Sequence, residues 1–274
     1  MIKFAAITPH PPIIIPTIGF PDDLDKTIKT RKSMEKLAKI FKKKRIETII
    51  LISPHAPIDY QKVAINISPT LSGNFEQFDD KETHLNFEND LETVDLLQQQ
   101  SKLQKIPLKL IEEPILDHGS LVPLYYLAKN YSLKNNKKLK IVSIAYSYPE
   151  PKINFDFGKI IFDACKVKGK RFAVVASGDL SHRLTLNAPG GYFPDAIEFD
   201  KQLIWLLDNN KTKEILEMNS DFIKKAGECG YLSIVMLLGL IEEINKRKFK
   251  KVKFKSLSYE GPFGVGYLVG YYPV

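Results

Sequence analysis

Thr48-Ile-Ile-Leu-Ile-Ser-Pro-His55 is the stretch that decides the fold. A short apolar, β-branched run that ends at a proline is typical of a β-strand. Similar runs predict five further strands: Ile2–Ile7, Val63–Ile67, Ile141–Ala145, Phe172–Ala176 and Val265–Gly270. The strand at Thr48–Ile52 is therefore one of a set spread along the whole chain.

Amphipathic segments with a helical period separate many of these strands. They are Asp22–Lys44, Glu88–Leu103, Leu121–Tyr131, Phe155–Lys166, Ala196–Asn209 and Tyr231–Lys246. Strands that alternate with helices predict an α/β sandwich, in which helices flank a central mixed or mainly parallel sheet. The chain has 274 residues and no repeat or linker-like tract, so we expect one domain spanning residues 1–274.

Composition argues against several classes of protein. The start, Met1 to Gly19, is interrupted by charge and prolines, which is unlike a secretory signal. The longest helical apolar stretch, Ile234–Ile241, is far shorter than the ~20 residues that a bilayer requires. The two cysteines, Cys165 and Cys229, do not make a disulfide framework. We therefore expect a cytoplasmic protein that does not enter a membrane.

The chain is basic, with 40 Lys and Arg against 32 Asp and Glu and a net charge of +8. Lysines gather in Lys26 to Arg45, Lys134 to Lys140 and Lys246 to Lys255. Binding of nucleic acid would require these lysines on one face, with aromatic residues between them for stacking. The runs instead fit helix surfaces and connectors, so we expect solvated faces and no nucleic-acid partner.

Four of the five histidines stand in short motifs punctuated by Pro or Gly: Thr8-Pro-His10-Pro-Pro, Ser53-Pro-His55-Ala-Pro, Asp117-His118-Gly-Ser and Gly178-Asp-Leu-Ser-His182. At least three of them follow a predicted strand. Ligands of open α/β sheets bind beyond the carboxyl ends of the strands, where parallel strands would gather these rings. Imidazole suits both metal binding and proton transfer near neutral pH. The pattern therefore predicts an enzyme with a metal centre.

A third metal ligand is expected from Ala226-Gly-Glu-Cys-Gly230, which lies just before the apolar helix at Tyr231. Two histidines and one carboxylate suit a non-haem Fe(II) site, and glycines let the chain approach an ion closely. Glu228 is the candidate carboxylate. The alternative is a glutamate at a helix start that interacts favourably with the helix dipole.

Six motifs occur in an order that points to a known family. They are His10-Pro-Pro-Ile-Ile-Ile-Pro, Ser-Pro-His55-Ala, Asp-His118-Gly-Ser-Leu-Val-Pro-Leu, Gly-Asp-Leu-Ser-His182-Arg-Leu, Gly-Glu228-Cys-Gly and Tyr259-Glu-Gly-Pro-Phe-Gly-Val-Gly-Tyr-Leu-Val. In these motifs the chain resembles the LigB-type class III extradiol dioxygenase superfamily. It is most similar to the stand-alone branch related to Memo and to the dioxygenase-like half of the AmmeMemoRadiSam proteins.

The resemblance implies a set of roles. His10, His55 and Glu228 would hold the metal, while His118 and His182 would line the substrate side, with His182 as the acid/base. It also implies Fe(II), a small aromatic substrate, O₂ and a homodimer.

The third ligand nevertheless stays open. In the Memo branch a cysteine at the position of Cys229 can join the metal site, and Glu260 is a rival carboxylate in an equally distinctive motif. A carboxylate would favour Fe(II), whereas a thiolate would suit Zn or Cu(I). Asp179 is a further residue near the site and a candidate to orient His182.

Three functions follow from these residues. The first is Fe(II)-dependent opening of a catechol ring by O₂. The second is a Memo-like metal-binding protein with a redox or regulatory role and no ring-opening activity. The third is an interaction module without catalysis. The fifth histidine, His84, stands among charged residues and is expected in a surface loop.

Overall fold

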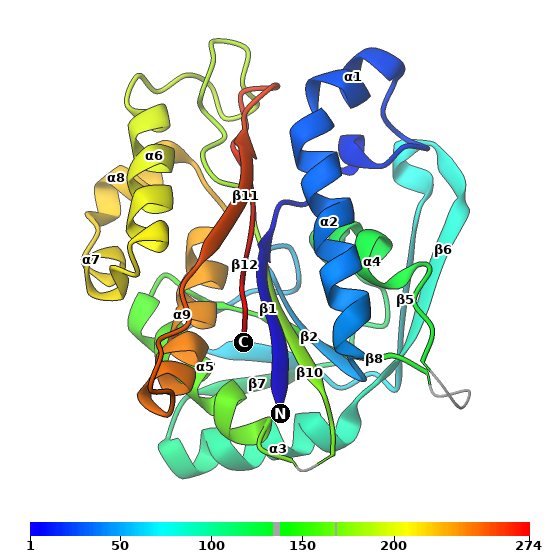
Figure 1. Ribbon diagram of the computed structural model, residues 1–274, viewed down its shortest axis with the longest axis vertical. Helices are drawn as coiled ribbons and strands as arrows, with labels where there is room; N and C mark the ends of the chain where they lie inside the picture. Colours follow the sequence, from blue (N-terminus) through cyan, green and yellow to red (C-terminus); the bar gives the residue numbers. More distant parts are fainter. Residues whose placement is uncertain (134–137, 168) are drawn as a thin grey trace.

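Four parallel strands form the centre of a mixed sheet (Figure 1). The computed structural model describes residues 1–133, 138–167 and 169–274. The central strands lie in the order β1 (Ile2–Thr8), β10 (Phe172–Ser177), β2 (Thr48–Ser53) and β8 (Lys140–Ala145). Every residue of β2 and β10 is buried. This burial explains why both strands are continuous apolar runs.

Further strands extend the centre on both sides. Next to β1 lie β12 (Tyr267–Tyr272) and β11 (Lys255–Glu260), both antiparallel to their neighbours. Next to β8 lie β4 (Val63–Asn66), β7 (Leu108–Ile111) and a hairpin of β5 (Thr70–Phe75) and β6 (Asp80–Asn89). Two short strands, β3 (Asp59–Tyr60) and β9 (Ser147–Tyr148), pair with each other. The described residues thus form a ten-stranded mixed sheet, which confirms the predicted α/β class.

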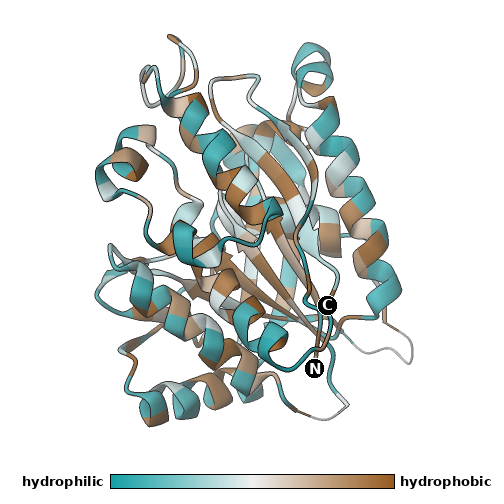
Figure 2. Ribbon diagram, turned by 60° about the vertical axis from the view of Figure 1, so that its left-hand side comes forward, coloured by the Kyte–Doolittle hydropathy of each residue, from teal (hydrophilic) through white to brown (hydrophobic). Residues whose placement is uncertain are grey.

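Helices cover both faces of the sheet. One face carries α1 (Pro21–Lys26), α2 (Ile28–Lys44) and α4 (His118–Ala128). The other carries α3 (Leu91–Gln104), α5 (Pro151–Ala164), α6 (Ala196–Asp208), α7 (Thr212–Leu216), α8 (Ser220–Ala226) and α9 (Tyr231–Lys246). Because side chains alternate along a strand, β2 sends Ile50 and Ile52 into one core and Ile49 and Leu51 into the other. Figure 2 shows the resulting apolar strands enclosed between the helices.

The six predicted strands are all present, with ends shifted by one or two residues. The helices agree less closely with the predictions. The segment Asp22–Lys44 is two helices, because the chain breaks at Thr27, whose hydroxyl donates to the Asp23 carbonyl. The segment Glu88–Leu103 becomes helical only at Leu91, since its first residues complete β6.

The β5–β6 hairpin is absent from the sequence-based prediction. It also corrects the place of His84, which is exposed on β6 rather than in a surface loop.

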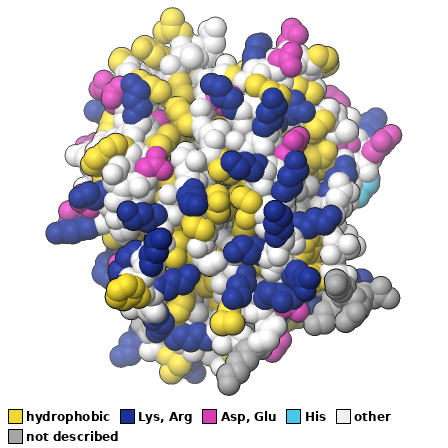
Figure 3. Space-filling model, in the orientation of Figure 1, with side chains coloured by type: hydrophobic (Ala, Val, Ile, Leu, Met, Phe, Trp, Pro, Cys, Tyr) yellow, Lys and Arg dark blue, Asp and Glu magenta, His cyan; other side chains and the backbone are white. Residues whose placement is uncertain are grey.

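Basic side chains are spread over the face that Figure 3 shows, among apolar and uncharged residues. The run from Lys26 to Arg45 falls mostly on α2, and the run from Lys246 to Lys255 links α9 to β11. Of the run from Lys134 to Lys140, residues 134–137 lie outside the described part of the chain. None of the helices that the structure describes has the length and apolar character that crossing a bilayer demands.

Candidate metal centre

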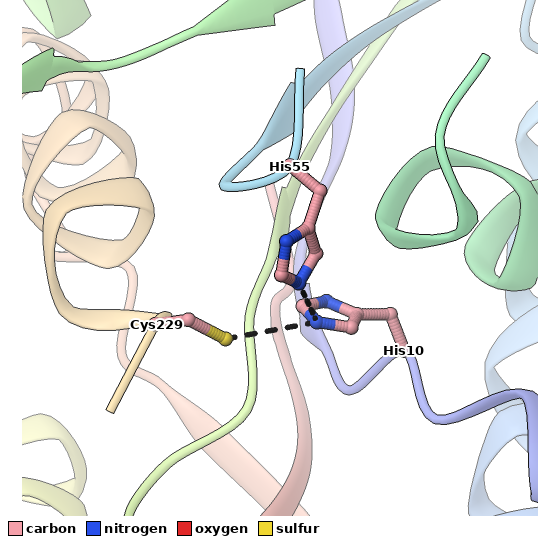
Figure 4. Close-up of side chains that lie close together, drawn as sticks. All are labelled: His10, His55 and Cys229. Carbon is pink, nitrogen blue, oxygen red and sulfur yellow. Dashed lines mark hydrogen bonds between the residues drawn. The ribbon is translucent and has the colours of Figure 1, made fainter. Parts of the chain in front are cut away.

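His10 and His55 meet at the carboxyl end of the central strands. A single proline separates β1 from His10 and, in the same way, β2 from His55. The two Nε2 atoms lie 3.0 Å apart, and the rings meet edge to face with centroids 4.8 Å apart (Figure 4). His10 is buried, with 2% of its surface exposed, whereas His55 is open to solvent. The predicted meeting of these two imidazoles is what the structure shows.

Ser177 determines which nitrogen of His10 faces the cluster. The Ser177 hydroxyl donates its hydrogen to the Gly119 carbonyl, and its oxygen lies 2.9 Å from His10 Nδ1. Because that hydrogen is already used, His10 Nδ1 must be the donor in the second contact. His10 Nε2 therefore carries a lone pair toward His55, which is the form that a metal ligand needs.

Cys229 supplies the third donor atom of the cluster. Its Sγ lies 3.6 Å from His10 Nε2, and one donor atom each from His10, His55 and Cys229 lie within 4.8 Å of one another. The end of β10 and the start of α9 approach closely here, because a side chain on Gly178 would lie 2.1 Å from the Gly230 Cα. The Asp179 carbonyl accepts hydrogen bonds from the amides of Cys229 and Gly230, which fixes the thiol beside the histidines.

Both candidate carboxylates have other partners. Glu228 accepts a hydrogen bond from the Tyr231 amide in the first turn of α9, as expected for a glutamate at a helix start. Glu260 accepts one from the Thr30 amide in the first turns of α2. Neither is in the cluster that the described residues form. The role of Glu228 as a ligand stays a prediction, and the geometry supports its neighbour Cys229 instead.

Asp179 contacts His10, whereas the sequence suggested His182 as its partner. One carboxylate oxygen accepts from the His10 amide at 3.0 Å, and the other lies 3.8 Å from His10 Nε2. Its own amide donates to Cys229 Sγ at 3.3 Å. Burial raises the pKa of Asp179 to about 7. Asp179 therefore ties the end of β10 to two of the three donor residues.

The protonation states of the donors bear on whether they fit a cation. Burial holds the pKa of His10 well below its usual value and lowers that of His55 to about 4, so both rings are neutral at pH 7. Burial raises the pKa of the Cys229 thiol, helped by the nearby carboxylates of Asp179 and Glu228. A divalent cation would oppose this effect by stabilising the thiolate, so its binding would release a proton.

Two of the three donor pairs, both made by His10, have the spacing of ligands on one ion, and all three donor atoms lie within 4.8 Å of one another. Donors on a tetrahedral zinc lie about 3.3 Å apart for two nitrogens and about 3.6 Å apart for nitrogen and sulfur. His10 Nε2 lies 3.0 Å from His55 Nε2 and 3.6 Å from Cys229 Sγ. His10, His55 and Cys229 are thus a suitable donor set.

Two further histidines border the cluster. The His118 ring stacks on His55 with centroids 4.3 Å apart and lies 5.5 Å from His10. His182 lies close enough to His10 and His55 that a proton on its ring would oppose their protonation, and its own Nδ1 is buried without a hydrogen-bond partner among the described residues. Burial lowers the pKa of both His118 and His182. All four predicted histidines therefore belong to one site.

Two residues of the site were not predicted. Ser177 orients His10, and its position between a predicted strand and the Gly178-Asp179 motif is a signal that could have found it. Phe78 packs edge-on against His118 with centroids 5.9 Å apart. Phe78 comes from the turn of the β5–β6 hairpin, so it could be placed only once that hairpin was known.

Comparisons with known proteins identify the family of this chain. The family description "Catalytic LigB subunit of aromatic ring-opening dioxygenase" matches residues 4–270. Protein CA_C1420 of Clostridium acetobutylicum is 33% identical over 270 residues, which is 95% of this chain and 55% of that protein. MEMO1 family protein MJ0403 of Methanocaldococcus jannaschii is 27% identical over 144 residues, covering 50% of this chain and 45% of that protein. The chain thus spans about half the length of these curated relatives.

A solved structure shares the fold. The crystal structure of uncharacterized protein JW3007 from Escherichia coli K12 superposes with a TM-score of 0.64, covers 98% of this chain and 99% of that one, and is 17% identical in sequence. The family match extends over nearly the whole chain and includes His10, His55 and Cys229. This chain belongs to the LigB family of aromatic ring-opening dioxygenases, a family that is generally metal-dependent.

Proposed function

We propose that this chain is a metal-dependent dioxygenase that opens the ring of a small catechol-type compound with O₂. The observation that carries the proposal is the meeting of three donor residues, His10, His55 and Cys229, with two additional histidines at the carboxyl end of the parallel strands. Family membership supports the same class of reaction.

His10, His55 and Cys229 would hold the metal. When bound, an iron(II) ion supplies Lewis acidity toward the catechol hydroxyls and redox chemistry toward O₂. The exposure of His55 leaves one side of the cluster accessible to a substrate, while buried His10 and Asp179 close the other side.

His182 and His118 would handle the protons. Because burial lowers the pKa of His182, its ring is neutral at pH 7 and can accept a proton from a catechol hydroxyl. The same ring can return that proton to the ring-opened product. His118 is also neutral and can donate an N–H to a substrate oxygen. Both oxygen atoms of O₂ enter the product, so the reaction needs no external reductant.

A second function is favoured by the thiol. Cys229 stands in the cluster where many Fe(II) sites have a carboxylate, and a His₂Cys donor set suits Zn or Cu(I). This set supports a Memo-like metal-binding protein with a redox or regulatory role and no ring-opening activity. The similarity to a MEMO1 family protein points the same way.

One experiment separates the two functions. Metal-free protein is loaded without oxygen with Fe(II), Zn or Cu(I), and 4-methylcatechol or 3,4-dihydroxyphenylacetate is added before air is admitted. We expect a yellow ring-opened product with Fe(II), and none with the His55→Ala variant. A protein that binds metal tightly but opens neither catechol would contradict the dioxygenase proposal and support the second function.

A further inference from the structure

The first turn of α4, residues 117–120, is joined by hydrogen bonds to the segment that carries His55. Asp117 caps the helix, since its two carboxylate oxygens accept from the Ser120 amide and the Ser120 hydroxyl, both at 2.9 Å. The carboxylate also accepts from the Ser53 hydroxyl at 2.6 Å, and the Ser53 oxygen accepts in turn from the His55 amide at 3.2 Å. Two hydrogen bonds in series thus connect this turn to the backbone of His55.

The same turn is connected to His10 by a second series of two hydrogen bonds. The Gly119 carbonyl accepts from the Ser177 hydroxyl, whose oxygen accepts in turn from His10 Nδ1 at 2.9 Å. One series thus ends at the backbone of His55 and the other at the ring of His10. Because both start from one helical turn, that turn relates the positions of the two metal-binding histidines to each other.

The turn packs closely against His55. A methyl group on Gly119 would lie 2.7 Å from Ser53 Oγ and 3.0 Å from His55 Cδ2, so the backbone of the turn is in contact with both residues. Ser53 has no exposed surface. The ring of His118, the second residue of the turn, stacks on the His55 ring with an interplanar angle of 29°. Hydrogen bonding and packing therefore both fix His55 against the start of α4.

The opposite end of β2 has a similar hydrogen bond, but no metal-binding residue follows it. There the Thr48 hydroxyl donates to the carboxylate of Asp90, which caps α3 by accepting from the Thr93 amide. A hydroxyl bonded to a helix-capping aspartate thus ties a helix to each end of β2. At Ser53 the same oxygen also holds the amide of a metal-binding residue.

We infer that Ser53 and Asp117 are positioning residues of the metal centre, which fix where His55 stands relative to His10. A ligand that is already in place loses less conformational entropy when an ion binds, so a loosened His55 would weaken binding. The neighbours that orient metal ligands typically contribute about 10- to 100-fold in metal affinity. The inference rests on metal binding by His10, His55 and Cys229, which both proposed functions share, and is independent of ring opening.

The test measures the affinity of metal-free protein for Zn(II) by competition with a coloured chelator. Ser53→Ala and Asp117→Ala should each bind Zn(II) about 10- to 100-fold more weakly than the unchanged protein. Asp117→Asn should recover most of this loss, because an amide oxygen can still accept from Ser53 and from the Ser120 amide. The amide nitrogen can donate to the Ser120 hydroxyl.

A second measurement needs no metal. In metal-free protein the stacked His118 ring should shift the NMR signals of the His55 ring protons upfield, because the centroids are only 4.3 Å apart. Ser53→Ala should move these signals toward those of an unstacked histidine. The signals of His84, which is exposed on β6, should stay where they are.

Thr48→Val is the matched control, since it removes the corresponding hydrogen bond at the end of β2 away from the metal centre. It should lower the melting temperature, as Ser53→Ala does, but leave the Zn(II) affinity and the His55 signals unchanged. An equal loss of affinity in both variants would overturn the inference, because global stability would then explain it.

Other outcomes also decide the inference. Unchanged Zn(II) affinity or unshifted His55 signals in Ser53→Ala would overturn it, and so would an Asp117→Asn protein that binds as weakly as Asp117→Ala. If the unchanged protein bound no Zn(II), Fe(II) or Cu(I), both proposed functions would fail, while the NMR signals would still show whether Ser53 positions His55.

Discussion

Adjacent residues in this site have opposite roles. The Cys229 thiol faces His10, while the Glu228 carboxylate turns to the first turn of α9. Gly227 ends α8 in the left-handed region, with φ of +66°, and so sets the direction in which the chain leaves the helix. The choice of donor at this point thus depends on backbone geometry as well as on the chemistry of the side chains.

Substitution at these two positions should therefore have unequal effects on metal content. We expect Cys229→Ser to lose most of the bound metal, because it removes a thiolate donor. Glu228→Gln should keep it, because an amide oxygen can still accept from the Tyr231 amide. Metal analysis of protein purified without oxygen, with His10→Ala as the empty reference, measures both. If Glu228→Gln contained as little metal as His10→Ala, the Glu228 carboxylate would have to be a metal ligand.

Asp200 provides a prediction for pH. It is fully buried on α6, where its carboxylate accepts from the Ser181 amide at 2.8 Å and the Tyr259 hydroxyl at 2.6 Å. Burial raises its pKa to about 6. The pKa of Asp200 is higher in the folded than in the unfolded state. The unfolding free energy that this difference adds is therefore fully present below about pH 4 and is lost as pH rises to about 6.

Asp200→Asn should abolish this pH-dependent loss of unfolding free energy, because an amide does not titrate. The amide keeps an oxygen for Ser181 and can donate to the Tyr259 hydroxyl. The variant should therefore gain about 2–3 kcal/mol in unfolding free energy relative to the original protein between pH 4 and pH 7. Urea unfolding of both metal-free proteins at pH 4, 5, 6 and 7 measures the difference. A difference that stays constant with pH would show that Asp200 does not titrate in this range.

Among the elements, the strands that carry the site were predictable and their neighbours were not. β2 and β10 are buried on both faces, so their sequences are continuous apolar runs that stand out. β11 reads Lys-Ser-Leu-Ser-Tyr-Glu and is held mainly by pairing with β12, so its sequence gives little signal. The histidines could be found because they follow predictable strands. Which of Glu228 and Cys229 faces them depends on the approach of α9 to β10, which local sequence does not encode.

That approach can be tested at Gly178. A methyl group there would lie 2.1 Å from the Gly230 Cα, so Gly178→Ala must push the start of α9 away from β10. We expect a loss of about 1–3 kcal/mol in unfolding free energy, together with a fall in metal content, since Cys229 moves with Gly230. Gly191→Ala is the control, because its methyl group meets open space and costs only the strain of a positive φ, about 1 kcal/mol. Normal metal content in Gly178→Ala would show that the contact does not position the thiol.

For the whole molecule, the donor residues link distant parts of the chain. His10, His55 and Cys229 follow β1, follow β2 and precede α9, respectively, and all three elements contact the core built on β10. Only the folded protein brings these three residues together, so only the folded state would bind an ion through them. Metal binding and global stability should therefore be coupled.

Thermal unfolding should show this coupling. At a free metal concentration 100 times the dissociation constant, binding adds about 2.7 kcal/mol to the unfolding free energy. For a chain of this size that should raise the melting temperature by about 5–10 °C. His55→Ala should show little or no rise, and a chelator should reverse the effect in the unchanged protein. An equal rise in both proteins would place the stabilising ion elsewhere.

The pairing of β1 with β10 and β12 has a consequence for synthesis on the ribosome. β1 emerges before both of its neighbours, which are residues 172–177 and 267–272. His10 and His55 therefore stay unassembled until β10, which pairs with both β1 and β2, has been translated. A metal ion could therefore meet all three donor residues only after Cys229 has been translated and β10 has paired with β1 and β2.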